Sequence, residues 1–152
     1  MRSAEYPVAG LTLLHLSDTH LRANGARLFD VVDGAERLGR ALAVFEASGI
    51  MPDAIIFTGD LADLGEPAAY ATLRALVEPL AKRLGARVLW VMGNHDQRGA
   101  FRAELLDEPA SLRPVDRVDE INGLRVITLD STVPGAHYGE LRDEQLQWRR
   151  DE

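Results

Sequence analysis

The chain has 152 residues and a formal net charge of −7 at pH 7, and 46% of its residues are hydrophobic. This length and apolar content fit one domain with its own core, and the acidic balance argues against a protein that grips nucleic acid by its phosphates. Because the chain has no cysteine, disulfides, thiolate metal ligands and cysteine nucleophiles are excluded, and any metal is held by oxygen and imidazole nitrogen.

The first ten residues contain Arg2 but then Glu5 and Pro7, without an apolar stretch of signal-peptide length. The run LTLLHL at residues 11–16 is too short to span a bilayer. We therefore expect no membrane segment and a cytoplasmic protein.

Short apolar runs then alternate with longer segments of helical period. The apolar runs predict buried strands, and the apolar stripes predict helices. In chain order, the expected elements are a strand at 11–16, a helix at about 33–48, a strand at 54–58, a helix at about 67–84 and a strand at 87–92. Pro79 lies inside the second helix and predicts a kink or an early break. This order predicts right-handed crossovers and a parallel sheet in an α/β fold.

A hairpin is predicted in the last third of the chain. After a short helix at 98–106, two alternating segments at 117–121 and 124–129 flank Asn122-Gly123, a pair typical of hairpin turns. A loop at 133–139 leads to a helix that begins near Glu140, and the chain stops within that pattern. We therefore expect residues 1–152 to be a domain truncated at its C-terminus, as in a gene fragment, a frameshift or an incomplete gene model.

Polar clusters follow each of the predicted parallel strands directly. They are Ser17-Asp18-Thr19-His20, Gly59-Asp60-Leu61-Ala62-Asp63 and Gly93-Asn94-His95-Asp96. Because the carboxyl ends of parallel strands form one edge of a sheet, where ligands bind, we expect the three clusters to converge.

The residue types in these clusters suit a pair of metal ions. Asp18 and His20, two apart in an extended segment, would project to one side and chelate one ion. The two oxygens of Asp60 can bridge two ions roughly 3.5–4 Å apart, and Asn94 adds a neutral carbonyl oxygen. His95 suits a hydrogen-bond or proton donor to a phosphoryl group better than a ligand. Two divalent ions would give this acidic protein a positive site, where a metal-bound hydroxide is the expected nucleophile.

The blocks Asp-x-His, Gly-Asp-x-x-Asp and Gly-Asn-His-Asp, in this order and at strand ends, resemble those of the calcineurin-like metallophosphoesterases. The stretches LLHLSDTHL, PDAIIFTGDLAD, GEPAAY and VMGNHD are similar to those of bacterial class III cyclic-nucleotide phosphodiesterases, which hydrolyse 3′,5′-cyclic AMP among other phosphodiesters. The resemblance implies the N-terminal part of a four-layer α/β/β/α sandwich, a βαβαβ unit followed by a hairpin.

The resemblance also implies roles for the site residues. Asp18, His20 and Asp60 would ligate a first metal, and Asp60 and Asn94 a second; the ions would be Mn or Fe, with Zn, Mg and Ni as alternatives. His95 would contact the substrate phosphate and protonate or stabilise the leaving oxygen. The implied reaction is metal-dependent hydrolysis of phosphodiesters, with 3′,5′-cyclic AMP giving 5′-AMP. The family has three further metal-binding histidines downstream, whereas the histidines here are His15, His20, His95 and His137.

Other polar residues near the clusters are expected to support the site. Asp63 and Asp96 would orient ligands or His95 rather than bind metal. His137, in the loop VPGAHYGE, is either a substrate contact above the metals or an exposed loop histidine. His15, mid-strand among leucines, is expected in or near the core, and Asp130 is expected to be structural.

Alternatives to a cyclic-nucleotide phosphodiesterase remain open. They are another hydrolase of the superfamily (a phosphomonoesterase, a nucleotide or phospholipid hydrolase, or a nuclease), a non-catalytic scaffold, and an inactive fragment. Retention of His95 and the N-terminal ligands argues against a scaffold, and the acidic composition argues against a nuclease. The expected partner is a small phosphodiester or cyclic nucleotide rather than nucleic acid, and a homodimer is left open.

Overall fold

The computed structural model describes residues 9–151. Most of the N-terminal segment on which the expectation of no signal peptide rests, residues 1–8, lies outside the described residues, as does Glu152. Within 9–151, none of the helices combines the length and hydropathy needed to cross a bilayer.

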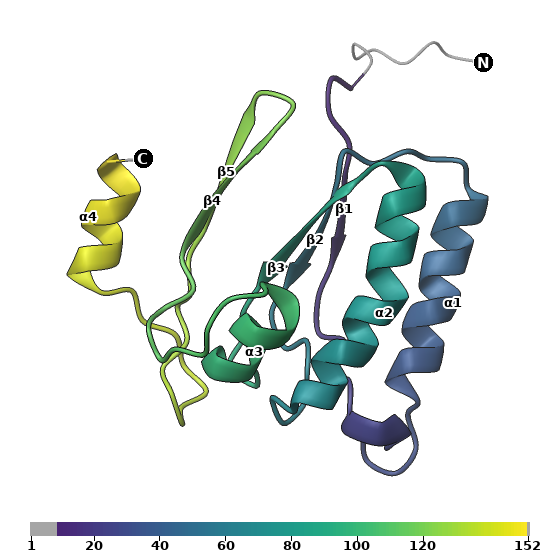
Figure 1. The fold of residues 1–152 in the computed structure, drawn as a ribbon, viewed down its shortest axis with the longest axis horizontal. Helices are drawn as coiled ribbons and strands as arrows, with labels where there is room; N and C mark the ends of the chain where they lie inside the picture. Colours follow the sequence, from purple (N-terminus) through teal and green to yellow (C-terminus); the bar gives the residue numbers. More distant parts are fainter. Residues whose placement is uncertain (1–8, 152) are drawn as a thin grey trace.

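A parallel sheet of three strands forms the centre of the molecule, as predicted, in the order β1-β2-β3 (Figure 1). The strands are β1 (Leu13–Leu16), β2 (Ala54–Thr58) and β3 (Arg87–Val91). Leu16 pairs with Phe57 and Phe57 with Trp90, so the three strands end side by side at one edge. This edge is the part of the fold that positions the site.

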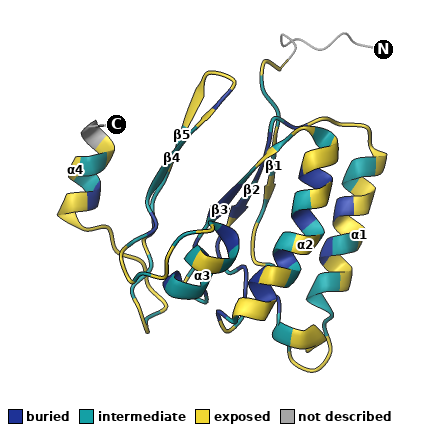
Figure 2. Cartoon of the chain, viewed as in Figure 1, coloured by how far each residue is buried: buried dark blue, intermediate teal, exposed yellow. Residues whose placement is uncertain are grey.

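Helices α1 (Gly34–Ala47) and α2 (Pro67–Leu84) cover one face of the sheet, and α3 (Arg98–Leu105) packs against α2. Asp33 begins α1 by accepting a hydrogen bond from the backbone N–H of Glu36. The buried residues gather where these helices meet the sheet (Figure 2). This core includes Leu38, Leu42, Ile55, Phe57, Tyr70, Leu73, Val77 and Trp90.

Pro79 does not interrupt α2, so the predicted early break is wrong. Proline removes the N–H that would bond to the carbonyl of Ala75, but Pro79 and Ala75 are both exposed, and water can hydrate that carbonyl. Val77 and Leu80 on either side are buried in the core and hold the helix in place.

The antiparallel hairpin β4 (Arg117–Ile121) and β5 (Leu124–Thr128) turns at Asn122 and Gly123, as predicted. Both turn residues have positive φ, 48° and 87°, as a type I′ turn requires. Helix α4 (Asp143–Asp151) starts slightly later than predicted, and a short 3₁₀ turn, η1 (Ala23–Gly25), was not predicted. The whole arrangement is consistent with the N-terminal part of the expected α/β/β/α fold.

The second face of the sheet is only partly covered, by Ile121 of the hairpin packed near Ala54. Successive side chains of a strand point to opposite faces, so His15 points away from α1 and α2. The side chain of His15 is exposed, with Nε2 2.6 Å from Oγ1 of Thr58, and the predicted core position of His15 is wrong.

Candidate metal centre

The three polar clusters lie together at the carboxyl edge of β1, β2 and β3. The backbone N–H of Asp18 donates to the carbonyl of Gly59 at 3.1 Å, and that of His20 donates to the carbonyl of Asp60 at 2.9 Å. These bonds join the segments that follow β1 and β2 beyond the ends of the strands. They bring the first two clusters into contact although the clusters are far apart in sequence.

The backbone at these residues is left-handed. The φ angles are 56° at Asp18, 41° at His20 and 52° at Asp60. The expectation of an extended Asp18–His20 segment is therefore wrong, and the two side chains converge through turns instead. Left-handed backbone costs a non-glycine residue roughly 1–3 kcal/mol, and such strain concentrates at functional sites where surrounding bonds hold it.

Ligand atoms from Asp18, His20 and Asp60 meet at one point. Nε2 of His20 lies 3.8 Å from Oδ2 of Asp60 and 4.0 Å from Oδ1 of Asp18. Atoms that each bind one ion at roughly 2.0–2.2 Å can lie no more than about 4.4 Å apart. Nε2 of His20 is within this limit of both carboxylates, and the three ligand atoms lie within 4.8 Å of one another. Carboxylate oxygen and imidazole nitrogen suit an ion such as Mn, Fe or Zn.

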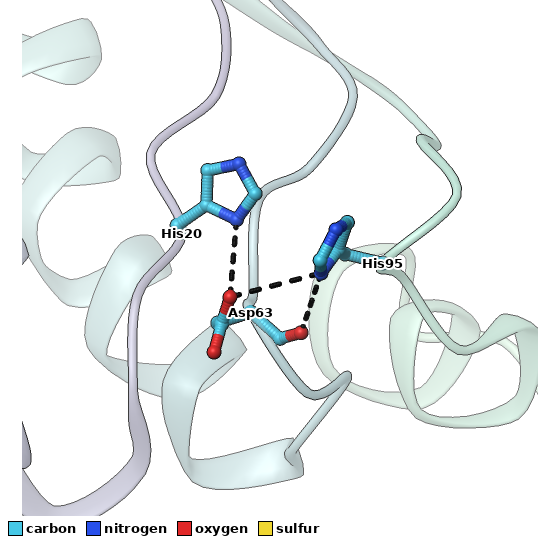
Figure 3. Close-up of side chains that lie close together, drawn as sticks. All are labelled: His20, Asp63 and His95. Carbon is cyan, nitrogen blue, oxygen red and sulfur yellow. Dashed lines mark hydrogen bonds and ion pairs between the residues drawn. The ribbon is translucent and has the colours of Figure 1, made fainter. Parts of the chain in front are cut away.

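Asp63 contacts both His20 and His95 (Figure 3). Its Oδ1 is 3.3 Å from Nδ1 of His20 and 3.7 Å from Nδ1 of His95, and its backbone carbonyl accepts a hydrogen bond from Nδ1 of His95 at 2.8 Å. A carbonyl oxygen only accepts, so Nδ1 of His95 carries a proton. Nε2 is thereby the free ring atom of His95. Ligand atoms of these three residues also lie within 4.8 Å of one another, but hydrogen bonds already hold this group together.

The backbone of His95 is fixed by Asp60. The N–H of His95 donates to Oδ1 of Asp60 at 3.0 Å, which leaves Oδ2 of Asp60 facing His20. The rings of His20 and His95 meet edge to face with centroids 4.8 Å apart. Asp60 thus contacts residues of both the first and the third cluster.

Asn94 is exposed, and its side chain contacts the loop that follows β5. Its Nδ2 donates to Nδ1 of His137 at 3.2 Å, and the ring centroid of His137 lies 6.1 Å from that of His95. His137 was left open between a substrate contact and an exposed loop residue. The structure places it at the edge of the site, exposed and in contact with Asn94.

Asp96 is buried and joins the loops of the second and third clusters. Its carboxylate accepts hydrogen bonds from the backbone N–H groups of Leu61, Ala62 and Gly93 and from the hydroxyl of Tyr70. Burial raises the pKa of Asp96, although these donors oppose the shift. Burial and the nearby Asp96 charge raise the pKa of Tyr70 as well. Sequence reasoning missed Tyr70, because a tyrosine in an apolar helix stripe predicts only core packing.

Arg22 also borders the site and was not predicted. Its guanidinium lies 3.6 Å from Oδ2 of Asp63 and 3.4 Å from Oε2 of Glu66, at the start of α2. Arg22 thus lies beside Oδ2 of Asp63, while Oδ1 of Asp63 faces His20 and His95. The only sequence signal was its position two residues after His20.

Comparisons with known proteins bear on this arrangement. The family model of the calcineurin-like phosphoesterases matches residues 11–151. A cAMP/cGMP dual specificity phosphodiesterase of Mycobacterium tuberculosis is 56% identical over 152 residues, which are 100% of this chain and 48% of that protein. A probable cyclic nucleotide phosphodiesterase of Rhodococcus erythropolis is 58% identical, over 100% of this chain and 50% of that protein. A 3′,5′-cyclic adenosine monophosphate phosphodiesterase of Pseudomonas aeruginosa is 35% identical, over 93% of this chain and 49% of that protein. The chain spans about half the length of these curated relatives.

Proposed function

The chain belongs to the calcineurin-like phosphoesterase family, and we propose that the protein that carries it is a metal-dependent phosphodiesterase that hydrolyses 3′,5′-cyclic AMP to 5′-AMP. The observation that carries the proposal is the meeting of the ligand atoms of Asp18, His20 and Asp60 at one sheet edge, beside His95. The names of the relatives, which concern cyclic nucleotides, support the substrate class.

The residues at this edge suit two divalent ions. Asp18, His20 and Asp60 would hold one ion, and Asp60 and Asn94 would contribute to the second. Oxygen and imidazole donors without thiolates suit Mn and Fe, and also Zn, Mg and Ni. When bound, such ions supply positive charge, activate a water molecule and neutralise charge on the phosphate oxygens.

The charge of the chain itself explains why the reaction would need metal. Asp18, Asp60 and Asp63 all lie at this edge, within a chain of net charge −7. These carboxylates alone would repel a phosphodiester. We therefore expect a chelator to abolish hydrolysis and added Mn²⁺ to restore it.

His95 would donate a proton to the leaving group. Its Nδ1–H is held by the carbonyl of Asp63, so a protonated ring donates through Nε2. Oδ1 of Asp63 lies 3.7 Å from the same Nδ1. In cyclic AMP, water adds to phosphorus, the bond from phosphorus to the 3′ oxygen breaks, and that oxygen takes the proton.

Asp63 would act by orientation. Its Oδ1 holds Nδ1 of His20, which directs Nε2 of that ring towards Asp18 and Asp60. Fixing the ring and its tautomer in this way is the usual task of a carboxylate behind a metal-binding histidine.

The Asp60→Asn variant tests the metal centre. Asparagine tolerates left-handed backbone and keeps an oxygen for the N–H of His95, so the change removes the charge with little other disturbance. In the complete protein with Mn²⁺, we expect hydrolysis of bis(p-nitrophenyl) phosphate to fall at least about 100-fold and Mn²⁺ binding to weaken, by analogy with loss of other charged catalytic groups.

The matched control is Asp30→Asn, the same substitution at another left-handed residue (φ 57°), exposed in the loop after η1. It should leave hydrolysis and Mn²⁺ binding unchanged. Full Mn²⁺-dependent activity in Asp60→Asn would contradict the proposal. If the aryl diester is hydrolysed but chromatography finds no 5′-AMP from cyclic AMP, the family reaction stands and the substrate is wrong.

A further inference from the structure

The loop that carries His137 is anchored to the polypeptide just after the third cluster. Asp130 is buried at the start of this loop, and its Oδ2 accepts a hydrogen bond from Nε of Arg98 at 2.8 Å. The same guanidinium donates to the carbonyl of Thr132 at 2.8 Å. Arg98 begins α3, four residues after Asn94. One buried side chain therefore sets the distance between the loop and the Asn94 segment.

Hydrogen bonds also join the two ends of the loop at residues 131–140, so the contacts of Arg98 hold the whole loop in place. Thr132 and Gly139 form an antiparallel bridge, and the N–H of Glu140 donates to the carbonyl of Ser131 at 2.7 Å. Residues 132–135 of the loop, Leu112 and the 94–98 segment line a small cavity of about 70 Å³. The position of His137 beside Asn94 is therefore built into the fold.

The contact between His137 and Asn94 has a defined direction. An amide –NH₂ group only donates, so Nδ1 of His137 is the acceptor and the ring proton lies on Nε2. Among the described residues, His137 is the hydrogen-bond partner of the Asn94 side chain. With Nδ2 turned to His137, the carbonyl oxygen Oδ1 is the amide atom left for a metal.

We propose that His137 is a positioning residue for the second metal: it holds the Asn94 amide so that Oδ1, and not Nδ2, is presented to the ion. This rests on the metal centre proposed above. It assigns the Nδ1 side of the ring to Asn94, which a direct substrate contact would not require. An unrestrained amide would have to lose its rotational freedom, and turn its oxygen inward, each time it bound metal.

Two substitutions at His137 distinguish the loss of its hydrogen-bond acceptor from a change in the size of its side chain. His137→Asn places Oδ1 one bond from Cγ, where Nδ1 stood, and keeps an acceptor for Asn94. His137→Leu has similar bulk and no acceptor. Because His137 is exposed, neither change removes core packing. Thermal unfolding of the metal-free proteins checks that both variants are folded.

The measurement is Mn²⁺ binding to the complete protein, by titration calorimetry and by electron paramagnetic resonance of free Mn²⁺. In wild type we expect two ions, both weakened by Asp60→Asn. In His137→Leu one ion should bind about 10- to 100-fold more weakly, the usual effect of losing a group behind a ligand, while the other is unchanged. His137→Asn should bind this ion within about threefold of wild type, well short of that 10- to 100-fold loss.

The outcomes distinguish this inference from the proposed function. If wild type does not bind two ions, the metal centre fails and the role of His137 fails with it. If wild type binds two ions and His137→Leu binds both equally well, the centre stands and the positioning role is overturned. The role is also overturned if the Leu and Asn variants are weakened equally, because the acceptor would then not matter.

Discussion

The carboxylate of Asp96 joins the two loops that present Asp60 and Asn94. It accepts backbone hydrogen bonds from Leu61 on one side and Gly93 on the other, so the spacing of the second and third clusters depends on it. Tyr70 of α2 donates to the same carboxylate at 2.9 Å and accepts from the N–H of Gln97 at 3.0 Å. The residues that would touch metal are thus held by buried groups that touch none.

Tyr70→Phe tests this support. The change removes one donor to Asp96 and leaves the N–H of Gln97 without its acceptor, while the ring still fills the core. We expect the free energy of unfolding to fall by about 1–2 kcal/mol, the usual effect of a lost buried hydrogen bond, measured by urea denaturation. Tyr138→Phe, at a 65% exposed tyrosine, is the control and should unfold like wild type. Equal stability of all three proteins would contradict the supporting role.

Sequence reasoning could find the chemistry of the candidate residues but not their conformations. Asp18, His20, Asp60 and Asn94 were identifiable because each follows a predicted strand, and strand ends share an edge. Left-handed φ angles are set by backbone bonds between distant segments, which a local pattern does not contain. His15 was misplaced for a similar reason, because an apolar run does not show which face of the sheet is covered.

At the scale of elements, the segments after β2 and β3 touch backbone to backbone. A Cβ added at Gly93 would lie 2.3 Å from both the backbone N and the Oδ1 of Asp60. One of these atoms is backbone and the other is fixed by its bond with His95, so neither can move away freely. The glycine in the Gly-Asn-His-Asp block therefore makes room for the candidate bridging ligand.

Gly93→Ala should disturb both stability and metal binding. Because the clash involves backbone, we expect a loss of about 1–3 kcal/mol in the free energy of unfolding, as in overpacked cores, with weaker Mn²⁺ binding. Gly39→Ala, the control, adds its Cβ within α1 with nothing within 4 Å. It should stabilise the protein by up to about 1 kcal/mol. Denaturation and Mn²⁺ titration of both variants give the comparison, and a Gly93→Ala protein that matches wild type in both would refute the steric argument.

Most elements could be predicted because their signals are local. The strand at Ala54–Thr58, the helix at Pro67–Leu84 and the hairpin turn at Asn122-Gly123 were located from periodicity and turn residues. Where the prediction failed, packing outweighed local preference: α2 continues through Pro79 because its neighbours are buried. The short turn η1 has no periodic pattern that could reveal it.

At the scale of the whole molecule, the described chain is a helix layer, a sheet and a hairpin, and the second face of the sheet is partly bare. Leu13 is 41% exposed on that face, as expected if further structure packs there. That residues 1–152 form a truncated domain stays a prediction; the chain spans about half the length of its curated relatives. The proposed centre accordingly draws four ligands from this chain, Asp18, His20, Asp60 and Asn94.

One buried ion pair links the start of α3 to the segment that follows β5. Nε of Arg98 and Oδ2 of Asp130 lie 2.8 Å apart, with side chains 5% and 0% exposed. Asp130 also accepts from the N–H groups of Val115 and Thr132. Burial works to raise the pKa of Asp130, but the hydrogen bonds from Arg98, Thr132 and Val115 outweigh it and hold that pKa below its ordinary value.

Asp130→Asn should therefore destabilise the protein in a pH-dependent way. At pH 7 it leaves the guanidinium of Arg98 buried without its counter-charge, which costs roughly 3–5 kcal/mol. A carboxylate with a lowered folded-state pKa stabilises fully above its unfolded pKa of about 4, and that contribution is lost as pH falls through the lower folded value. The gap between wild type and variant should be constant from pH 7 to 5 and shrink below about pH 4, as measured by urea denaturation at each pH. The other carboxylates, Asp96 included, are present in both proteins, so their pH-dependent contributions cancel in the difference between the two free energies of unfolding. A gap that stayed the same down to pH 3 would show that Asp130 acts by shape and not by charge.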